Sequence, residues 1–65
     1  MNPYLKEISF ILHILEGLKN NPRTLYSFQI FSDNSCVFRE TVNEKVWYGE
    51  NPRELYQLLK KEKFN

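Results

Sequence analysis

The spacing of hydrophobic residues changes twice along the chain, and these changes restrict the fold more than any other feature. In residues 3–19 the spacing alternates between four and three, as on one side of a helix, at Tyr4, Ile8, Ile11, Leu15 and Leu18. Residues 24–31 alternate with a period of two, and β-prone runs follow at 36–42 and 45–49. Helical spacing returns after residue 50. We therefore predict the order helix, three-stranded meander, helix.

Asn-Pro pairs punctuate this pattern. Each pair could open a helix, because asparagine suits the N-cap and proline suits the first helical position. The strongest case is Asn51-Pro52, where Glu54 completes a sequence that resembles a capping box. We expect the first helix to end with Asn20 in a left-handed conformation, followed by Pro22. Turns are expected at 32–35 and at Asn43-Glu44.

The length of the chain allows one domain, residues 1–65. Its 27 hydrophobic residues are all bulky, with no alanine among them. Both helices need an apolar surface, and the sheet supplies one. We therefore predict a two-layer α+β sandwich in which both helices lie on one face of a three-stranded antiparallel meander.

The alternation in the strands assigns side chains to two faces. We expect an inward set of Tyr26, Phe28, Ile30, Cys36, Phe38, Val46 and Tyr48. The opposite face would then carry Leu25, Ser27, Gln29, Phe31, Val37, Arg39, Thr41, Lys45 and Trp47. That face mixes aromatic, aliphatic and cationic groups, as recognition surfaces do. From it we select five partner-binding residues: Phe31, Val37, Arg39, Lys45 and Trp47. In the alternative interpretation, Trp47 and Phe31 only cover each other across the sheet.

The outer flank of the first helix is a second candidate surface. Phe10 and Ile14 widen its apolar side beyond what packing on one sheet requires. A homodimer interface at Phe10 and Ile14 would use this surplus. The alternative is that the second helix covers the same flank.

Catalytic and metal-binding patterns are weak. Ser9, His13 and Glu16 could share one side of a helix, but a solvent-facing stripe provides neither an oxyanion hole nor exclusion of water. Cys36 is the one cysteine, which favours a structural thiol in a reducing cytoplasm over a disulfide or a zinc site. We predict a protein without catalytic residues, metal ligands or cofactor.

Charge and hydropathy argue against further classes. The net charge of +1 makes binding to nucleic acid by charge alone improbable, and lysines 60, 61 and 63 fit a solvated helix end. Uncharged runs are too short to span a bilayer, and residues 1–20 lack the basic start of a signal peptide. We expect a complete cytoplasmic chain that does not bind membranes.

These observations favour a small interaction protein, either an adaptor or an inhibitor that occupies the surface of a larger protein. A composition rich in Asn, Lys, Ile, Leu and Phe is typical of AT-rich bacterial, phage or mobile-element genes. The alternative is a nucleic-acid-binding module, because double-stranded-RNA-binding domains share this order of elements. Against it, the last helix begins with one arginine, Arg53, beside Glu54.

Overall fold

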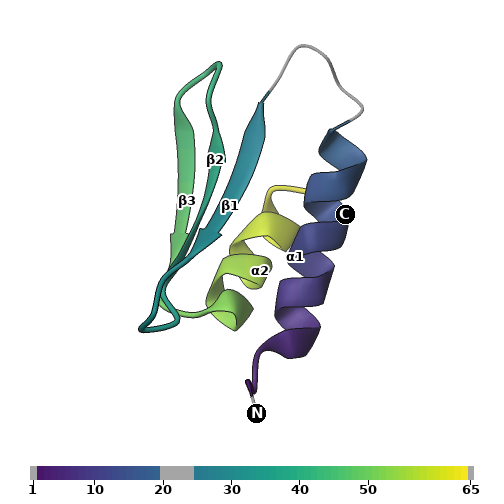
Figure 1. The fold of residues 1–65 in the computed structure, drawn as a ribbon. Helices are drawn as coiled ribbons and strands as arrows, with labels where there is room; N and C mark the ends of the chain where they lie inside the picture. The colour runs from purple at the N-terminus through teal and green to yellow at the C-terminus, as the bar shows by residue number, and fades with distance from the viewer. Residues whose placement is uncertain (1, 20–24, 65) are drawn as a thin grey trace.

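The order of elements confirms the predicted helix, meander and helix. The computed structural model describes residues 2–19 and 25–64, so the predicted end of the first helix at Asn20 and Pro22 lies outside the described residues. The elements are α1 (Leu5–Leu18), β1 (Tyr26–Ile30), β2 (Cys36–Glu40), β3 (Lys45–Gly49) and α2 (Pro52–Lys61) (Figure 1). The strands form an antiparallel sheet in the order β1-β2-β3.

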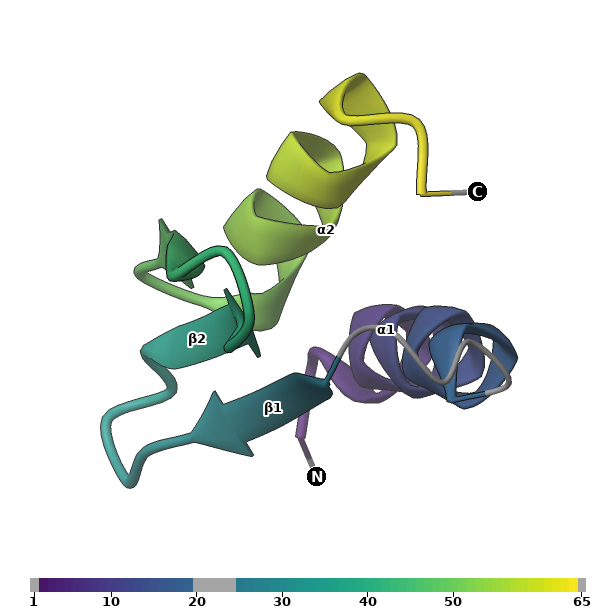
Figure 2. The ribbon, with the colours of Figure 1, turned by 90° about the horizontal axis from the view of Figure 1, so that it is seen from above.

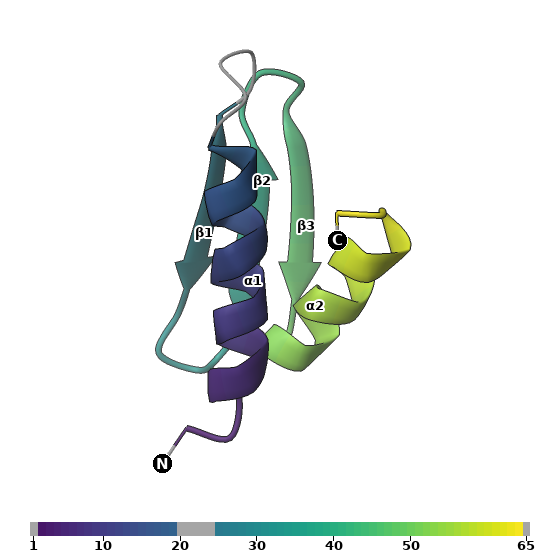
Figure 3. The ribbon, with the colours of Figure 1, turned by 90° about the vertical axis from the view of Figure 1, so that its right-hand side faces the viewer.

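Both helices pack on one face of the sheet, as predicted (Figures 2 and 3). Helix α1 contacts β1, helix α2 contacts β3 and β2, and the helices contact each other. The buried core lies between the two layers and consists of Ile11, Ile14, Cys36, Phe38, Leu55 and Leu59. Burial of one side chain of this size stabilises a fold by about 1.5–3 kcal/mol. The core is therefore small and depends on each of its members.

The lengths of the two strand connections decide which side chains face the helices. Residues directly opposite each other in an antiparallel pair share a face. Five residues connect β1 to β2, and Phe28 lies opposite Phe38. Four residues connect β2 to β3, and Phe38 lies opposite Trp47. When the connection has an even number of residues, even-numbered residues of one strand lie opposite odd-numbered residues of the next. Trp47 therefore lies on the same face of the sheet as Phe38.

Our face assignment for the third strand was therefore wrong. We expected Val46 and Tyr48 to point inward, but they lie on the face away from the helices, opposite Arg39 and Val37 respectively. The assignments for the first two strands hold: Tyr26 and Phe28 pack against the core, and Cys36 and Phe38 are buried in it.

The start of α2 follows the predicted cap. The Asn51 side chain accepts a hydrogen bond from the Glu54 amide at 2.9 Å, and Pro52 occupies the first turn. Gly49 allows this helix to approach β3, since a Cβ atom there would lie 2.7 Å from the Leu55 nitrogen. By contrast, α1 begins at Leu5 without a side-chain cap, and the Asn2 side chain instead accepts a hydrogen bond from the Tyr4 amide.

Phe64 closes the core from the C-terminal end, a role that we did not predict. Lys63 adopts a left-handed conformation with φ 61°, and its amide donates to the Lys60 carbonyl. The Phe64 amide donates to the Leu59 carbonyl at 3.2 Å. This pair of hydrogen bonds defines a Schellman motif. It turns the Phe64 ring back onto Trp47, with ring centroids 5.2 Å apart and nearly perpendicular planes.

Candidate functional site

The face of the sheet that points away from the helices is the main candidate site. We call it the open face. Its members alternate along the strands, and a hydrogen bond from the Thr41 amide to the Leu25 carbonyl extends the β1–β2 ladder to one further pair. Within the described part of the chain, both helices lie on the other side of the sheet (Figure 2). The open face comprises Leu25, Ser27, Gln29, Val37, Arg39, Thr41, Val46 and Tyr48.

Two of the five predicted partner-binding residues lie within strands on the open face. Val37 occupies its centre between Gln29 and Tyr48, and it is 8% exposed although no helix covers it. Arg39 is exposed between Ser27 and Val46. Flanking side chains therefore shield the central valine and leave the arginine accessible.

Phe31, the third predicted residue, follows the last residue of β1 and is 42% exposed. Its amide donates a hydrogen bond to the Ser35 carbonyl, and its carbonyl accepts one from the Asn34 amide. Asn34 has a left-handed backbone with φ 73°. The Asp33 carboxylate accepts hydrogen bonds from the hydroxyl and the amide of Ser35, and these bonds lower the pKa of Asp33 below its usual value. The turn thus holds Phe31 at one end of the sheet.

Trp47 and Lys45, the remaining two, are on the helix side, which corrects their predicted placement. Trp47 is opposite Phe38, with ring centroids 6.0 Å apart, and it packs on Phe64 as well. Lys45 is opposite Glu40. The alternative interpretation, in which Trp47 and Phe31 cover each other, is also wrong, because Phe38 and Phe64 are the aromatic partners of Trp47 among the described residues.

Val46 and Tyr48 replace Trp47 and Lys45 on the open face. Val46 is 59% exposed and Tyr48 is 55% exposed. The connection length contained the signal for this placement. We expected a turn of two residues, and the observed turn has four. Because both numbers are even, either turn places Trp47 on the same face of the sheet as Phe38.

Glu40 fixes the turn beside the open face. This glutamate is 2% exposed, and its carboxylate accepts hydrogen bonds from the backbone amide and the side-chain amide of Asn43. Because a buried carboxylate needs such partners, the interaction sets the turn geometry. Glu44 follows with φ 57°. The same turn borders a shallow hollow of about 280 Å³ that includes Arg39 and Val46.

Helix α2 contacts the flank of α1 that we considered for a dimer. Ile14 is 6% exposed and belongs to the core, which corrects its prediction as a dimer-interface residue. Phe10 packs on Tyr56 of α2, with ring centroids 5.1 Å apart. Arg53 adds a polar contact, with its Nε 3.3 Å from a Glu7 carboxylate oxygen. Helix α2 thus covers part of this flank, as in the alternative that the sequence left open, whereas Phe10 remains 40% exposed and a dimer contact there stays a prediction.

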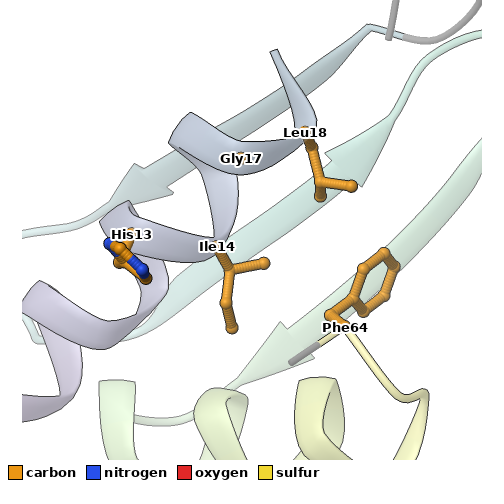
Figure 4. A pocket seen from close by; sticks show the side chains of 5 residues that line it. All are labelled: His13, Ile14, Gly17, Leu18 and Phe64. Carbon is orange, nitrogen blue, oxygen red and sulfur yellow. The ribbon is translucent and has the colours of Figure 1, made fainter. Parts of the chain in front are cut away.

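A groove lies between α1 and the C-terminal tail (Figure 4). Its volume is about 360 Å³, and Ile14 and Leu18 point toward Phe64 across it. His13 stands at its border on α1. Glu16, the expected neighbour of His13, instead pairs with Lys19 at 3.5 Å. The lining is mainly apolar and brings together no acid, base and nucleophile.

Cys36 is a buried free thiol, as expected for a structural residue. Burial, with a smaller contribution from Glu54, raises its pKa to about 11. The sulfur is therefore protonated at neutral pH, which opposes nucleophilic reactivity.

Comparisons with known proteins returned no match among family models, curated proteins or solved structures. Within residues 2–19 and 25–64, no three His, Cys, Asp or Glu side chains are grouped to hold a metal ion. Neither described helix has the length and apolar character needed to cross a bilayer. The functional assignment must therefore come from the surfaces described above.

Proposed function

We propose that this chain is a small, non-enzymatic protein-interaction module that binds a larger protein through the open face. Its action would be that of an adaptor or an inhibitor. One observation carries the proposal: a sheet face without helical cover in the described residues displays Val46, Tyr48 and Leu25, each more than half exposed, together with the exposed Arg39. Tyrosine and arginine are, with tryptophan, the side chains enriched among the residues that contribute most binding energy at protein interfaces. The free thiol Cys36 supports a reducing cytoplasm as the location.

Binding to nucleic acid has less support. Arg39 is on the open face, whereas Lys45 is on the helix side, so the two cations do not form one patch. Arg53 opens α2, but its guanidinium pairs with Glu7 and lies 5.3 Å from the centre of the Tyr4 ring. A phosphate surface requires several cations aligned for one backbone.

A capture experiment tests the proposal. The chain is immobilised, and proteins are captured from the source organism with the wild type and with the double variant Arg39→Ala, Tyr48→Ala. We expect one protein to be captured by the wild type and lost with the double variant. Removal of two such anchors typically weakens binding by about 2 kcal/mol or more.

Gln57→Ala is the matched control, because Gln57 is exposed on α2, away from the open face. Urea unfolding of all three proteins shows whether they remain folded. Equal capture by the double variant at equal stability would refute the proposal. Binding to an RNA duplex that weakens steeply with added salt would instead support the nucleic-acid alternative.

A further inference from the structure

The free edge of β1 exposes a defined set of unpaired backbone groups. The Phe31 amide bonds to Ser35, and the Leu25 carbonyl bonds to Thr41, so odd-numbered residues at both ends of β1 face β2. Backbone bonding alternates along an antiparallel strand. The amides and carbonyls of Tyr26, Phe28 and Ile30 therefore point away from β2. Among the described residues, no backbone group outside the strand pairs with them.

This edge lacks the features that usually protect an edge strand. Residues 25–31, Leu-Tyr-Ser-Phe-Gln-Ile-Phe, contain no charge, proline or glycine. Natural edge strands usually carry lysine, proline or a bulge that prevents pairing with another chain. The opposite edge, β3, begins with Lys45 and is bordered by the exposed residues Glu44 and Glu50. The β1 edge is thus the one suited to accept another strand.

An apolar flank of α1 lies beside the β1 edge. Leu5 and Leu12 are separated by seven residues, so they point in nearly the same direction from the helix. They are 58% and 49% exposed, because α2 contacts the other flank of α1 through Phe10. Ile30 adds a 39% exposed side chain from the helix side of β1. Together, the β1 edge and this flank offer both backbone bonds and apolar contacts.

The position of α1 determines whether the β1 edge can pair with a second copy of the chain or with an extended segment. Among the strands, α1 contacts β1, and it runs in front of the sheet close to that edge (Figure 3). In a dimer formed by two β1 strands, the strands would lie about 4.8 Å apart. The two copies of α1 would then also be brought close together, whereas packed helices need about 8–10 Å between their axes. An extended segment that carries no helix has no such conflict.

We propose that the β1 edge binds an extended segment of a partner protein as a fourth, antiparallel strand. Alternate side chains of that segment would be apolar and would contact Leu5, Leu12 and Ile30. This mode is β-strand addition, in which main-chain bonds provide affinity and alternate side chains provide specificity. The proposal adds a second surface to the proposed function. It does not depend on Arg39 or Tyr48, so the two proposals can fail separately.

A capped peptide of alternating threonine and valine, with a lysine at each end, is the probe. Amide hydrogen exchange of the whole 65-residue chain is followed by NMR with and without the peptide. We expect exchange at Phe28 and Ile30 to slow by about tenfold or more at saturation. Ser27 and Gln29 serve as internal controls, because their amides face β2. In the proposed pairing, a valine of the peptide lies opposite Phe28, so the valine amides face β1 and the threonine amides point away from it. N-methylation of the valines should therefore abolish the slowing of exchange. N-methylation of the threonines should leave it unchanged.

The variant Leu5→Ala, Leu12→Ala provides a second test on a folded chain, because both side chains are about half exposed. Its affinity for the peptide should fall by about tenfold, and the control Ser9→Ala, also exposed on α1, should bind like the wild type. Unchanged exchange at Phe28 and Ile30 at millimolar peptide would overturn the proposal. So would equal binding by the valine-methylated peptide.

Discussion

The two glycines of the chain are used in opposite ways. A Cβ atom at Gly49 would lie 2.7 Å from the Leu55 nitrogen and 2.9 Å from the Asn51 carbonyl oxygen, both fixed backbone atoms. At Gly17, within α1, it would meet nothing within 4 Å. Gly49 is therefore required by the approach of α2 to β3, whereas Gly17 only adds flexibility to a helix.

Alanine at each glycine should have opposite effects on stability. Gly49→Ala should lower the free energy of unfolding by about 2 kcal/mol or more, because backbone must move. Gly17→Ala should raise it by about 0.5–1 kcal/mol, because alanine restricts the unfolded chain and favours the helix. Urea unfolding of both variants measures the two changes. A stabilising Gly49→Ala would contradict the close packing of α2 on β3.

Cys36 should make stability fall in alkaline solution. Its pKa is about 11 in the fold, above its usual 9.0, so the folded chain holds the thiol proton more tightly than the unfolded chain. The contribution is fully present below pH 9 and is lost as the pH rises toward 11. The measurement is the urea midpoint at pH 8 and pH 10.5, for the wild type and for Cys36→Ala. We expect a smaller loss with pH in the variant, and an equal loss would show that Cys36 does not contribute.

At the scale of elements, the end of α2 stabilises the core through Phe64. This ring packs on Tyr26 and Phe38 as well as Trp47, with centroid distances of 5.9 and 5.8 Å to the first two. Phe64→Ala should therefore lower the free energy of unfolding by about 2 kcal/mol, less than for a fully buried phenylalanine.

Lys63→Gly is the control for that experiment. Glycine adopts the left-handed conformation of residue 63 without steric cost, so this variant should be as stable as the wild type or up to about 1 kcal/mol more stable. Urea unfolding compares the variants. Wild-type stability in Phe64→Ala would mean that the tail does not close the core.

The elements that the sequence predicted correctly depend on local chemistry. Asn51 caps α2 through a contact three residues away, and the helical spacing of Ile11 and Leu15 holds within one element. The errors concerned features that depend on residues far apart in the sequence. The orientation of Trp47 depends on the number of residues in the preceding turn, and the contacts of Phe64 reach back to residues on β1, β2 and β3.

The difference between local and distant relations also explains which residues of the candidate site could be predicted from the sequence. Val37 and Arg39 could be placed on the open face because successive residues of a strand point to opposite faces, and Cys36 and Phe38 belong to the core. Val46 and Tyr48 required the register between β2 and β3, which the alternation of a single strand cannot provide. Ile14 could not be assigned to core or surface until the position of α2 was known.

At the scale of the whole molecule, one sheet has two faces with different roles. The helix side contains the buried core and the aromatic cluster of Trp47, Phe38 and Phe64. The open face presents Tyr48, Val46 and Arg39 without helical cover in the described residues. The proposed function requires this division, because a face that holds the fold together is not free to bind a partner.

Urea unfolding of Trp47→Ala and Tyr48→Ala tests this division most directly, since the two residues are neighbours in β3 with opposite orientations. Trp47→Ala should lower the free energy of unfolding by about 2 kcal/mol or more, through loss of its contacts with Phe38 and Phe64. Tyr48→Ala should lower it by less than about 1 kcal/mol, because that side chain is 55% exposed. The reverse order, with Tyr48→Ala the more damaging change, would contradict the assignment of the open face.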